Sequence, residues 1–165
     1  MGKIFIVIAL FCATLLSASD ANHQGGAFKL MESKATKNTS QTIHWAKDFS
    51  DALKKAKKTN KPVFFVSSRH TCKYCVILEE TTFADKRVID ELNKNFVSVV
   101  SYSDEQDYMP KELWRPGTPA LWFLKPSGEP MFQPIMGAID AEQFLDALSI
   151  VEKEYAKSAK AKAVK

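Results

Sequence analysis

The sequence predicts an α/β domain in which helices flank a central mixed β-sheet. Its continuous apolar runs at 63–66 and 96–100 are typical of strands buried on both faces. Segments with apolar residues at helical spacing precede, separate and follow these runs, and this alternation favours a parallel portion of the sheet. Two further apolar runs surround the turn residues 126–129, so we expect a hairpin that forms an antiparallel edge.

The individual elements follow from the spacing of apolar residues and from the positions of turn residues. The first helix is expected at 45–58, with Ala46, Phe49, Leu53 and Ala56 on one face, and it ends at Asn60-Lys61-Pro62. After the strand at 63–66 we expect a helix that starts at Cys72 and continues through 76–80, and a second helix at 85–93. The remaining expected elements are a strand at 96–100, a polar loop at 104–116 with a short helix near Leu113, strands at 119–124 and 131–136, and a helix at 141–155.

Residues 1–19 have the pattern of a secretory signal peptide. Lys3 supplies a positive charge, residues 4–16 are apolar apart from Thr14, and residues 17–19 are small. This run is shorter than the roughly 20 apolar residues that a membrane-spanning helix needs. We therefore expect cleavage before Asp20 and export to the periplasm, with an uncleaved membrane anchor as the alternative.

The formal net charge of +4 is concentrated at the two ends of the chain. Lys3 lies in the leader and four lysines lie in the last nine residues, so the rest of the chain is slightly negative. This distribution argues against a nucleic-acid-binding protein. We expect a flexible segment at 20–42, one folded domain at 43–156 and a basic flexible tail at 157–165.

A Cys-x-x-Cys motif follows the first buried strand. If the leader is removed, Cys12 is lost with it, and Cys72 and Cys75 are the only thiols of the mature chain. At a strand-to-helix junction, Cys72 would lie at the helix N-terminus, where the helix dipole and unpaired N–H groups stabilise a thiolate. Arg69, His70 and Lys73 would add positive charge, and Cys75, one turn further on, would be less exposed and suited to resolve a mixed disulfide.

Zinc binding and covalent haem attachment are two other uses of a cysteine pair with this spacing. Zinc usually needs four ligands, and beyond the pair the chain offers only His23, His44 and His70, so we expect no metal. Covalent haem attachment needs a histidine directly after the second cysteine, where this sequence has Val76. An incidental disulfide remains an alternative to a redox couple.

A second feature is Gly117-Thr118-Pro119-Ala120 at the start of an apolar strand. A proline in this position is a candidate for a cis peptide bond, although the tripeptide alone is equally compatible with a trans proline. A Cys-x-x-Cys motif earlier in the same chain favours the cis form.

Together these motifs resemble the thioredoxin superfamily, and most closely its exported members typified by the C-terminal domain of the thiol:disulfide interchange protein DsbD. The resemblance covers about 43–155. It rests on Ile43-x-Trp45, Lys61-Pro62-Val63, the string from Cys72 through Cys75, Glu79 and Thr82-Phe83 to Asp85, and Gly117-Thr118-Pro119-Ala120 with Phe123.

The resemblance implies a thioredoxin fold and a role for each matching residue. Cys72 would be the attacking thiol and Cys75 the resolving thiol, while Thr118 and Pro119 would form a cis-proline loop that pairs with the substrate backbone. Lys73 and Tyr74, between the two cysteines, would contact the substrate. Many members carry a buried acid six residues before the first cysteine, where this chain has Val66, and Glu79 is then the nearby carboxylate on the same helical face.

The resulting hypothesis is a periplasmic thiol–disulfide oxidoreductase that reduces the disulfides of substrate proteins. It needs no cofactor, and a membrane thiol reductase would supply its electrons. We expect a monomer. A disulfide isomerase, a disulfide oxidase, a non-enzymatic peptide-binding module and a metal carrier using Cys72, Cys75 and His70 remain alternatives.

Overall fold

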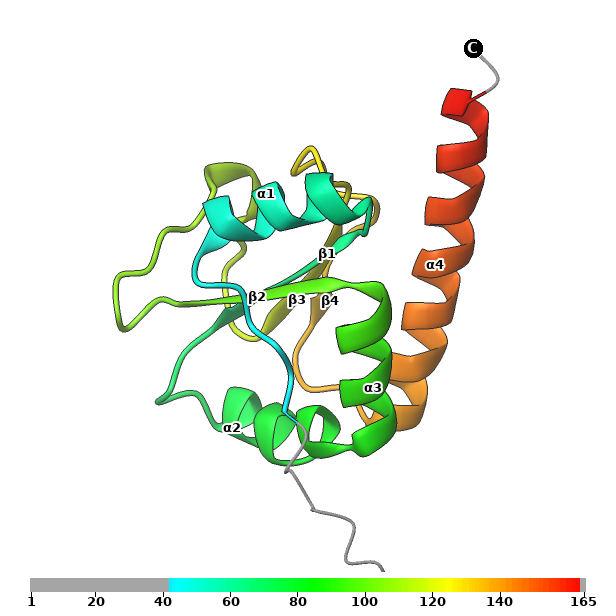
Figure 1. Cartoon of the computed structure of the whole chain (residues 1–165). Helices are drawn as coiled ribbons and strands as arrows, with labels where there is room; N and C mark the ends of the chain where they lie inside the picture. Colours follow the sequence, from blue (N-terminus) through cyan, green and yellow to red (C-terminus); the bar gives the residue numbers. More distant parts are fainter. Residues whose placement is uncertain (1–41, 164–165) are drawn as a thin grey trace, which may run out of the picture. The chain divides into compact units, whose positions relative to one another are not determined.

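The computed structural model describes residues 42–163 (Figure 1). The expected signal peptide at 1–19 and the segment at 20–41 lie outside the described residues. No helix in the described part of the chain is both long and apolar enough to cross a membrane. The elements in chain order are α1 (Phe49–Thr59), β1 (Val63–Ser68), α2 (Lys73–Glu80), a 3-10 helix (Thr82–Ala84), α3 (Lys86–Asn95), β2 (Val97–Tyr102), a second 3-10 helix (Lys111–Leu113), β3 (Ala120–Leu124), β4 (Ile135–Met136) and α4 (Ala141–Ala163).

The four strands form one mixed sheet in the order β2-β1-β3-β4. β1 pairs with β2 in parallel, from Val63 opposite Val97 to Ser68 opposite Tyr102. β3 runs antiparallel to β1, and β4 runs antiparallel to β3. The predicted central mixed sheet, with a parallel portion and an antiparallel closing hairpin, is therefore confirmed.

Alternate residues of the strands feed two separate cores, one on each face of the sheet. Phe64 and Val66 of β1 pack with Leu78 of α2 and with side chains of α3 and α4. Val63 and Phe65 pack on the opposite face against α1 and the loop that precedes β3. Figure 1 shows α1 apart from the other three helices. Because both faces are covered, β1 and β3 are buried along their whole length, as their uninterrupted apolar sequences require.

Several predicted boundaries were wrong. α1 begins at Phe49 and not at 45, because the Asp48 side chain accepts a hydrogen bond from the Asp51 N–H and caps the helix. Trp45 lies outside the helix and forms an isolated parallel bridge with Ser98. α2, by contrast, begins at Lys73, directly after Cys72, where the helix N-terminus was expected.

The two C-terminal elements also differ from their predicted lengths. β4 contains only Ile135–Met136, whereas a strand at 131–136 was expected. Residues before it are joined to β3 only through a bridge between Leu124 and Pro130 and a hydrogen bond from the Met131 N–H to the Phe123 carbonyl. α4 continues to Ala163, so the residues at 157–163, expected in a flexible tail, are helical.

Candidate redox site

The two cysteines lie where the chain leaves the end of β1 and enters α2. Cys72 is the N-cap residue of α2 and is partly exposed, whereas Cys75 lies within the first turn of the helix and is 1% exposed. The predicted position of Cys72 at a helix N-terminus is confirmed. Since no side chain caps this helix end, the backbone N–H groups of its first turn remain available to a negative charge at Cys72.

The environment of Cys72 favours its thiolate. Burial alone would raise the pKa of this thiol, but hydrogen bonds from the Thr118 side chain, from the Cys75 thiol and from the backbone N–H groups of Cys75 and Tyr74 lower it below the ordinary value. These donors act on the charged form of the sulfur and therefore stabilise it. The predicted direction of the shift is confirmed.

The environment of Cys75 has the opposite effect. Burial raises the pKa of the Cys75 thiol above its ordinary value, and the hydrogen bond with Cys72 adds to this rise. Hydrogen bonds from the Thr118 and Ser68 side chains and from the Arg69 backbone oppose the rise without cancelling it. The pair is thus divided into an accessible thiol that ionises readily and a buried thiol that keeps its proton.

The loop before β3 touches the cysteine pair. The Thr118–Pro119 peptide bond is cis, as predicted. The Cys72 thiol donates a hydrogen bond to the Thr118 carbonyl over 3.3 Å, and Pro119 is buried. Next to Thr118 lies a hollow of about 350 Å³, lined among others by Arg69, Trp114 and Arg115.

Two of the three cationic side chains expected around Cys72, those of His70 and Arg69, have polar partners of their own. His70 faces two carboxylates: its Nδ1 lies 3.3 Å from Asp104 Oδ1 and its Nε2 lies 3.7 Å from Glu105 Oε1. Arg69 Nε donates to Ser103 Oγ over 3.3 Å. Lys73 and Tyr74 are exposed on the outer side of α2. The leading causes of the lowered pKa of Cys72 are hydrogen bonds, and not these cations.

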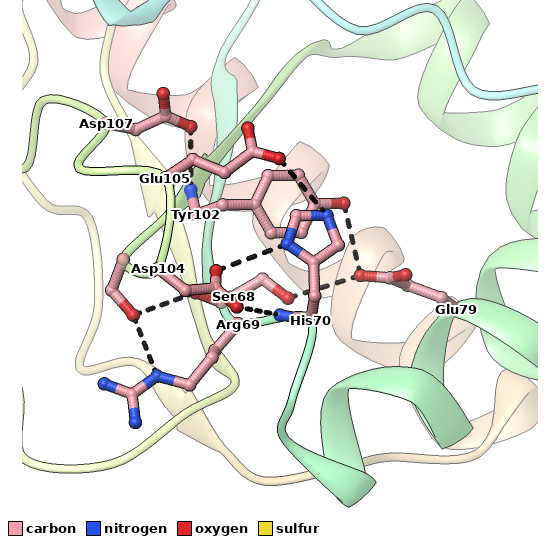
Figure 2. A network of polar contacts seen from close by, with 9 residues as sticks. Ser68, Arg69, His70, Glu79, Tyr102, Asp104, Glu105 and Asp107 are labelled. Atoms are coloured by element: carbon pink, nitrogen blue, oxygen red, sulfur yellow. Dashed lines mark hydrogen bonds and ion pairs between the residues drawn. The ribbon is translucent and has the colours of Figure 1, made fainter.

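Glu79 of α2 belongs to a polar network with residues of β1, β2 and the loops that follow these strands (Figure 2). Its Oε1 accepts a hydrogen bond from the Ser68 hydroxyl over 3.2 Å and another from the Tyr102 hydroxyl over 3.3 Å. The His70 ring stacks on the Tyr102 ring with centroids 4.0 Å apart. Burial and the negative charge of Glu79 raise the pKa of Tyr102 to about 12. The phenol therefore stays protonated and can donate a hydrogen bond to Glu79.

Sequence reasoning identified Glu79 but missed Ser68 and Tyr102. The alternation of side chains along a strand places Ser68 on the same face as Val66, the position where related proteins carry an acid. That signal alone could have identified Ser68. Tyr102 is its register partner on β2, and apolar patterning does not define which residues of two parallel strands lie opposite each other.

The metal-carrier alternative requires Cys72, Cys75 and His70 to act together. Within residues 42–163 no three His, Cys, Asp or Glu side chains are grouped as metal ligands. The His70 ring lies against Tyr102 and faces Asp104 and Glu105. Its nitrogens are therefore occupied by carboxylate partners.

Comparisons with known proteins find similar sequences and similar solved structures. Part of the chain is similar to spermatogenesis-associated protein 20 of Rattus norvegicus, with 38% identity over 64 residues, which are 39% of this chain and 8% of that protein. The chain thus spans a small fraction of the length of the curated relatives it matches. A thioredoxin from Thermus thermophilus superposes with a TM-score of 0.57 at 23% identity, over 67% of this chain and 87% of the other.

The C-terminal domain of Neisseria meningitidis DsbD, in its reduced form, superposes with a TM-score of 0.50 at 20% identity, over 61% of this chain and 90% of the other. At these identities the two structures establish the fold, which is the thioredoxin fold predicted from the sequence. The model of the thioredoxin-like domain family matches residues 49–152, a span that contains both cysteines and the cis proline. The chain belongs to the thioredoxin-like domain family.

Proposed function

We propose that this protein is a thiol–disulfide oxidoreductase that uses Cys72 and Cys75 to reduce disulfides in substrate proteins. The observation that carries the proposal is the arrangement of the two thiols: Cys72 is the partly exposed N-cap of α2 and contacts the Thr118 carbonyl, whereas Cys75 is buried in the first turn. This arrangement favours a lowered pKa at Cys72 and a raised pKa at Cys75. The attacking sulfur must be a thiolate, whereas the second thiol must stay protonated until a mixed disulfide has formed.

The reaction transfers two electrons and two protons. The Cys72 thiolate attacks one sulfur of the substrate disulfide, forms a Cys72–substrate disulfide and releases the other substrate sulfur as a thiolate. Cys75 then loses its proton and attacks the Cys72 sulfur, which breaks the mixed disulfide and releases the second substrate sulfur. The protein is left with a Cys72–Cys75 disulfide, and an external dithiol must reduce it again.

Substrate recognition is assigned to the surface around Thr118. An extended peptide can pair with the backbone of Thr118, which already contacts Cys72 through its carbonyl. The adjacent hollow and the exposed Lys73 and Tyr74 then supply contacts for neighbouring side chains of the substrate. Glu79 is assigned to accept the proton that Cys75 loses, since Val66 replaces the acid of related proteins.

The charges around the site favour reduction over oxidation. Cations beside the attacking sulfur would stabilise the reduced protein and make the pair a stronger oxidant. Here His70 lies between Asp104 and Glu105, so this stabilisation is weakened. With the leader at 1–19, we place the protein in the periplasm, where a membrane thiol reductase would return it to the dithiol form.

Turnover of a dye-labelled peptide disulfide, with dithiothreitol as the electron source, tests the proposed function. Wild-type protein should accelerate the reduction, Cys72→Ser should abolish the acceleration, and Cys75→Ser should accumulate a mixed disulfide with the peptide. Cys72→Ser with unchanged activity in a functional assay would instead indicate a non-enzymatic peptide-binding module. Equilibration with glutathione should give a reduction potential nearer to about −270 mV than to about −120 mV, and the opposite result would indicate an oxidase.

A further inference from the structure

Ser68 occupies a buried position between the resolving cysteine, Cys75, and the carboxylate of Glu79. Ser68 is 1% exposed, at the C-terminal end of β1. Its hydroxyl donates to Glu79 Oε1 over 3.2 Å, and the same side chain is close enough to the Cys75 sulfur to act on the pKa of that thiol. Ser68 is therefore the hydroxyl that joins a buried thiol to a carboxylate.

Cys75 needs such a connection because it is almost fully buried. Its thiol must lose a proton when it attacks the mixed disulfide, and at 1% exposure bulk water does not reach it. A hydroxyl can accept one proton while it donates another, which neither an apolar side chain nor a thioether can do. The neighbouring position on the same face of β1, Val66, has no group that takes part in proton transfer.

We propose that Ser68 passes the proton of Cys75 to Glu79 when the mixed disulfide is resolved, an inference that rests on the proposed function. The Tyr102 hydroxyl, which donates to the same Glu79 oxygen over 3.3 Å, holds this carboxylate in position. Ser68 and Tyr102 are register partners on β1 and β2, so the sheet itself sets the spacing of the two hydroxyls that converge on Glu79.

The step balances in atoms and electrons. The Cys75 sulfur supplies the electron pair of the new Cys72–Cys75 bond, and the bond between Cys72 and the substrate sulfur breaks. The proton of Cys75 moves to the Ser68 oxygen while the hydroxyl proton of Ser68 moves to Glu79. The substrate leaves as a thiolate, and Glu79 is left as a neutral carboxylic acid.

Glu79 can then return its proton to solvent on its other side. A hollow of about 390 Å³ is lined by Glu79 and Tyr102 together with the apolar side chains of Trp45 and Phe83. The charged and titratable groups around Glu79 and Tyr102 are Cys75 on α2, His70 in the loop after β1, and Glu105 in the loop after β2. Because these groups also titrate, the test compares variants at each pH and does not rely on one pH profile alone.

The two steps can be separated with dithiobis(nitrobenzoate) in a stopped-flow experiment. The reduced full-length protein is mixed with one equivalent of the reagent. Attack by Cys72 releases a first coloured thiolate, and resolution by Cys75 releases a second. Ser68→Ala should leave the first release unchanged and slow the second about 10- to 100-fold near neutral pH, in line with the loss of a proton-transfer group. Above pH 9 the difference should shrink, because the Cys75 thiol is then increasingly ionised before it attacks and needs no proton acceptor.

Three further variants distinguish proton transfer from a loss of packing. Ser98→Ala removes another buried serine hydroxyl from the neighbouring strand, opposite Phe64, and should slow neither release. Ser68→Thr keeps the hydroxyl and should restore most of the second release. The double variant Ser68→Ala/Glu79→Gln should be no slower than Ser68→Ala alone, because both changes interrupt one path.

The results separate this inference from the proposed function. The role of Ser68 would be overturned if Ser68→Ala gave the second thiolate release at the wild-type rate. It would also be overturned if the double variant were slower than Ser68→Ala by the full effect of Glu79→Gln. Neither result would contradict the activity of the wild-type protein. A slow second release that persists unchanged above pH 9 would likewise overturn the role of Ser68. A wild-type protein that never gives a second release would contradict the proposed function itself.

Discussion

The Cys72 thiol contacts the Thr118 carbonyl over 3.3 Å, which ties the start of α2 to the loop before β3. The Thr118 side chain also lowers the pKa of each of the two cysteine thiols. A single residue far along the chain therefore acts on both thiols of the pair, and its two polar groups have opposite effects on Cys72. The carbonyl accepts from the protonated thiol, whereas the hydroxyl stabilises the thiolate.

The first prediction concerns which cysteine reacts. Substoichiometric iodoacetamide added to the reduced protein near pH 6 should label Cys72 in preference to Cys75. The pKa of Cys72 is lowered and that of Cys75 is raised, and only the thiolate is nucleophilic. Peptide mapping by mass spectrometry measures the two yields. Preferential labelling of Cys75 would reverse the assignment of attacking and resolving thiols.

The second prediction concerns the Thr118 hydroxyl. Thr118→Val keeps the branched shape of the side chain and removes the donor, so the pKa of Cys72 should rise and its alkylation near pH 6 should slow. The thiolate absorbance of the reduced protein, followed between pH 4 and 10, measures this shift directly. Thr81→Val is a matched control, because the Thr81 hydroxyl donates to the Ile77 carbonyl within α2 and touches neither sulfur. Equal titration curves for Thr118→Val and wild type would remove Thr118 as a cause.

The apolar pattern was sufficient to predict the order and type of the elements. The uninterrupted run in β1 correctly indicated a strand covered on both faces, and the turn at 126–129 correctly indicated the hairpin. β2 was expected to be equally buried, but some of its residues, such as Val97 and Val100, are partly exposed. Helix ends were predicted less well, because they depend on local hydrogen bonds. Asp48 and Asp85 each cap a helix through their side chains, and a polar residue with this role cannot be distinguished from an ordinary surface residue by spacing alone.

The candidate site was predictable only in part, for a similar reason. Cys72, Cys75 and Glu79 are close in sequence on one helix, so helical spacing places them together. The contact with Thr118 was expected from the family resemblance. The neutralisation of His70 by Asp104 and Glu105, and the pairing of Ser68 with Tyr102, depend instead on how the loops and the register of β1 and β2 bring distant residues together.

The third prediction concerns Glu79. Glu79→Gln should slow disulfide reduction with little loss of stability, because the amide retains the shape of the side chain and can still accept hydrogen bonds from the hydroxyls of Ser68 and Tyr102. Steady-state rates between pH 5 and 9 and a thermal unfolding curve measure the two effects. Glu80→Gln, on the exposed side of the same helix, is the control. An unchanged pH–rate profile for Glu79→Gln would show that Glu79 takes no part in proton transfer.

The last prediction concerns a pair of carboxyl groups far from the cysteines. Glu91 of α3 and Glu152 of α4 interact with each other, and this interaction lowers the pKa of Glu91 and raises that of Glu152. The Asn95 amide donates to Glu91 over 2.6 Å and to Glu152 over 3.2 Å. Burial, together with the negative charge of Glu91, raises the pKa of Glu152 from 4.5 to about 7.

Because the pKa of Glu152 is higher in the folded protein, the folded state binds this proton more tightly than the unfolded chain does. The stabilisation is complete below the unfolded pKa of 4.5 and is lost as the pH rises through about 7. Glu152→Gln keeps a neutral side chain at every pH, so this variant should match wild type at pH 4 and unfold a few degrees higher at pH 8. Thermal unfolding followed by circular dichroism measures the difference. The control is Glu154→Gln: the Glu154 carboxylate pairs with Lys157 at 2.5 Å on the same helix, and its replacement should not raise the unfolding temperature at pH 8. A Glu152→Gln protein that is no more stable than wild type at pH 8 would show that the pKa of Glu152 is not raised in the folded protein.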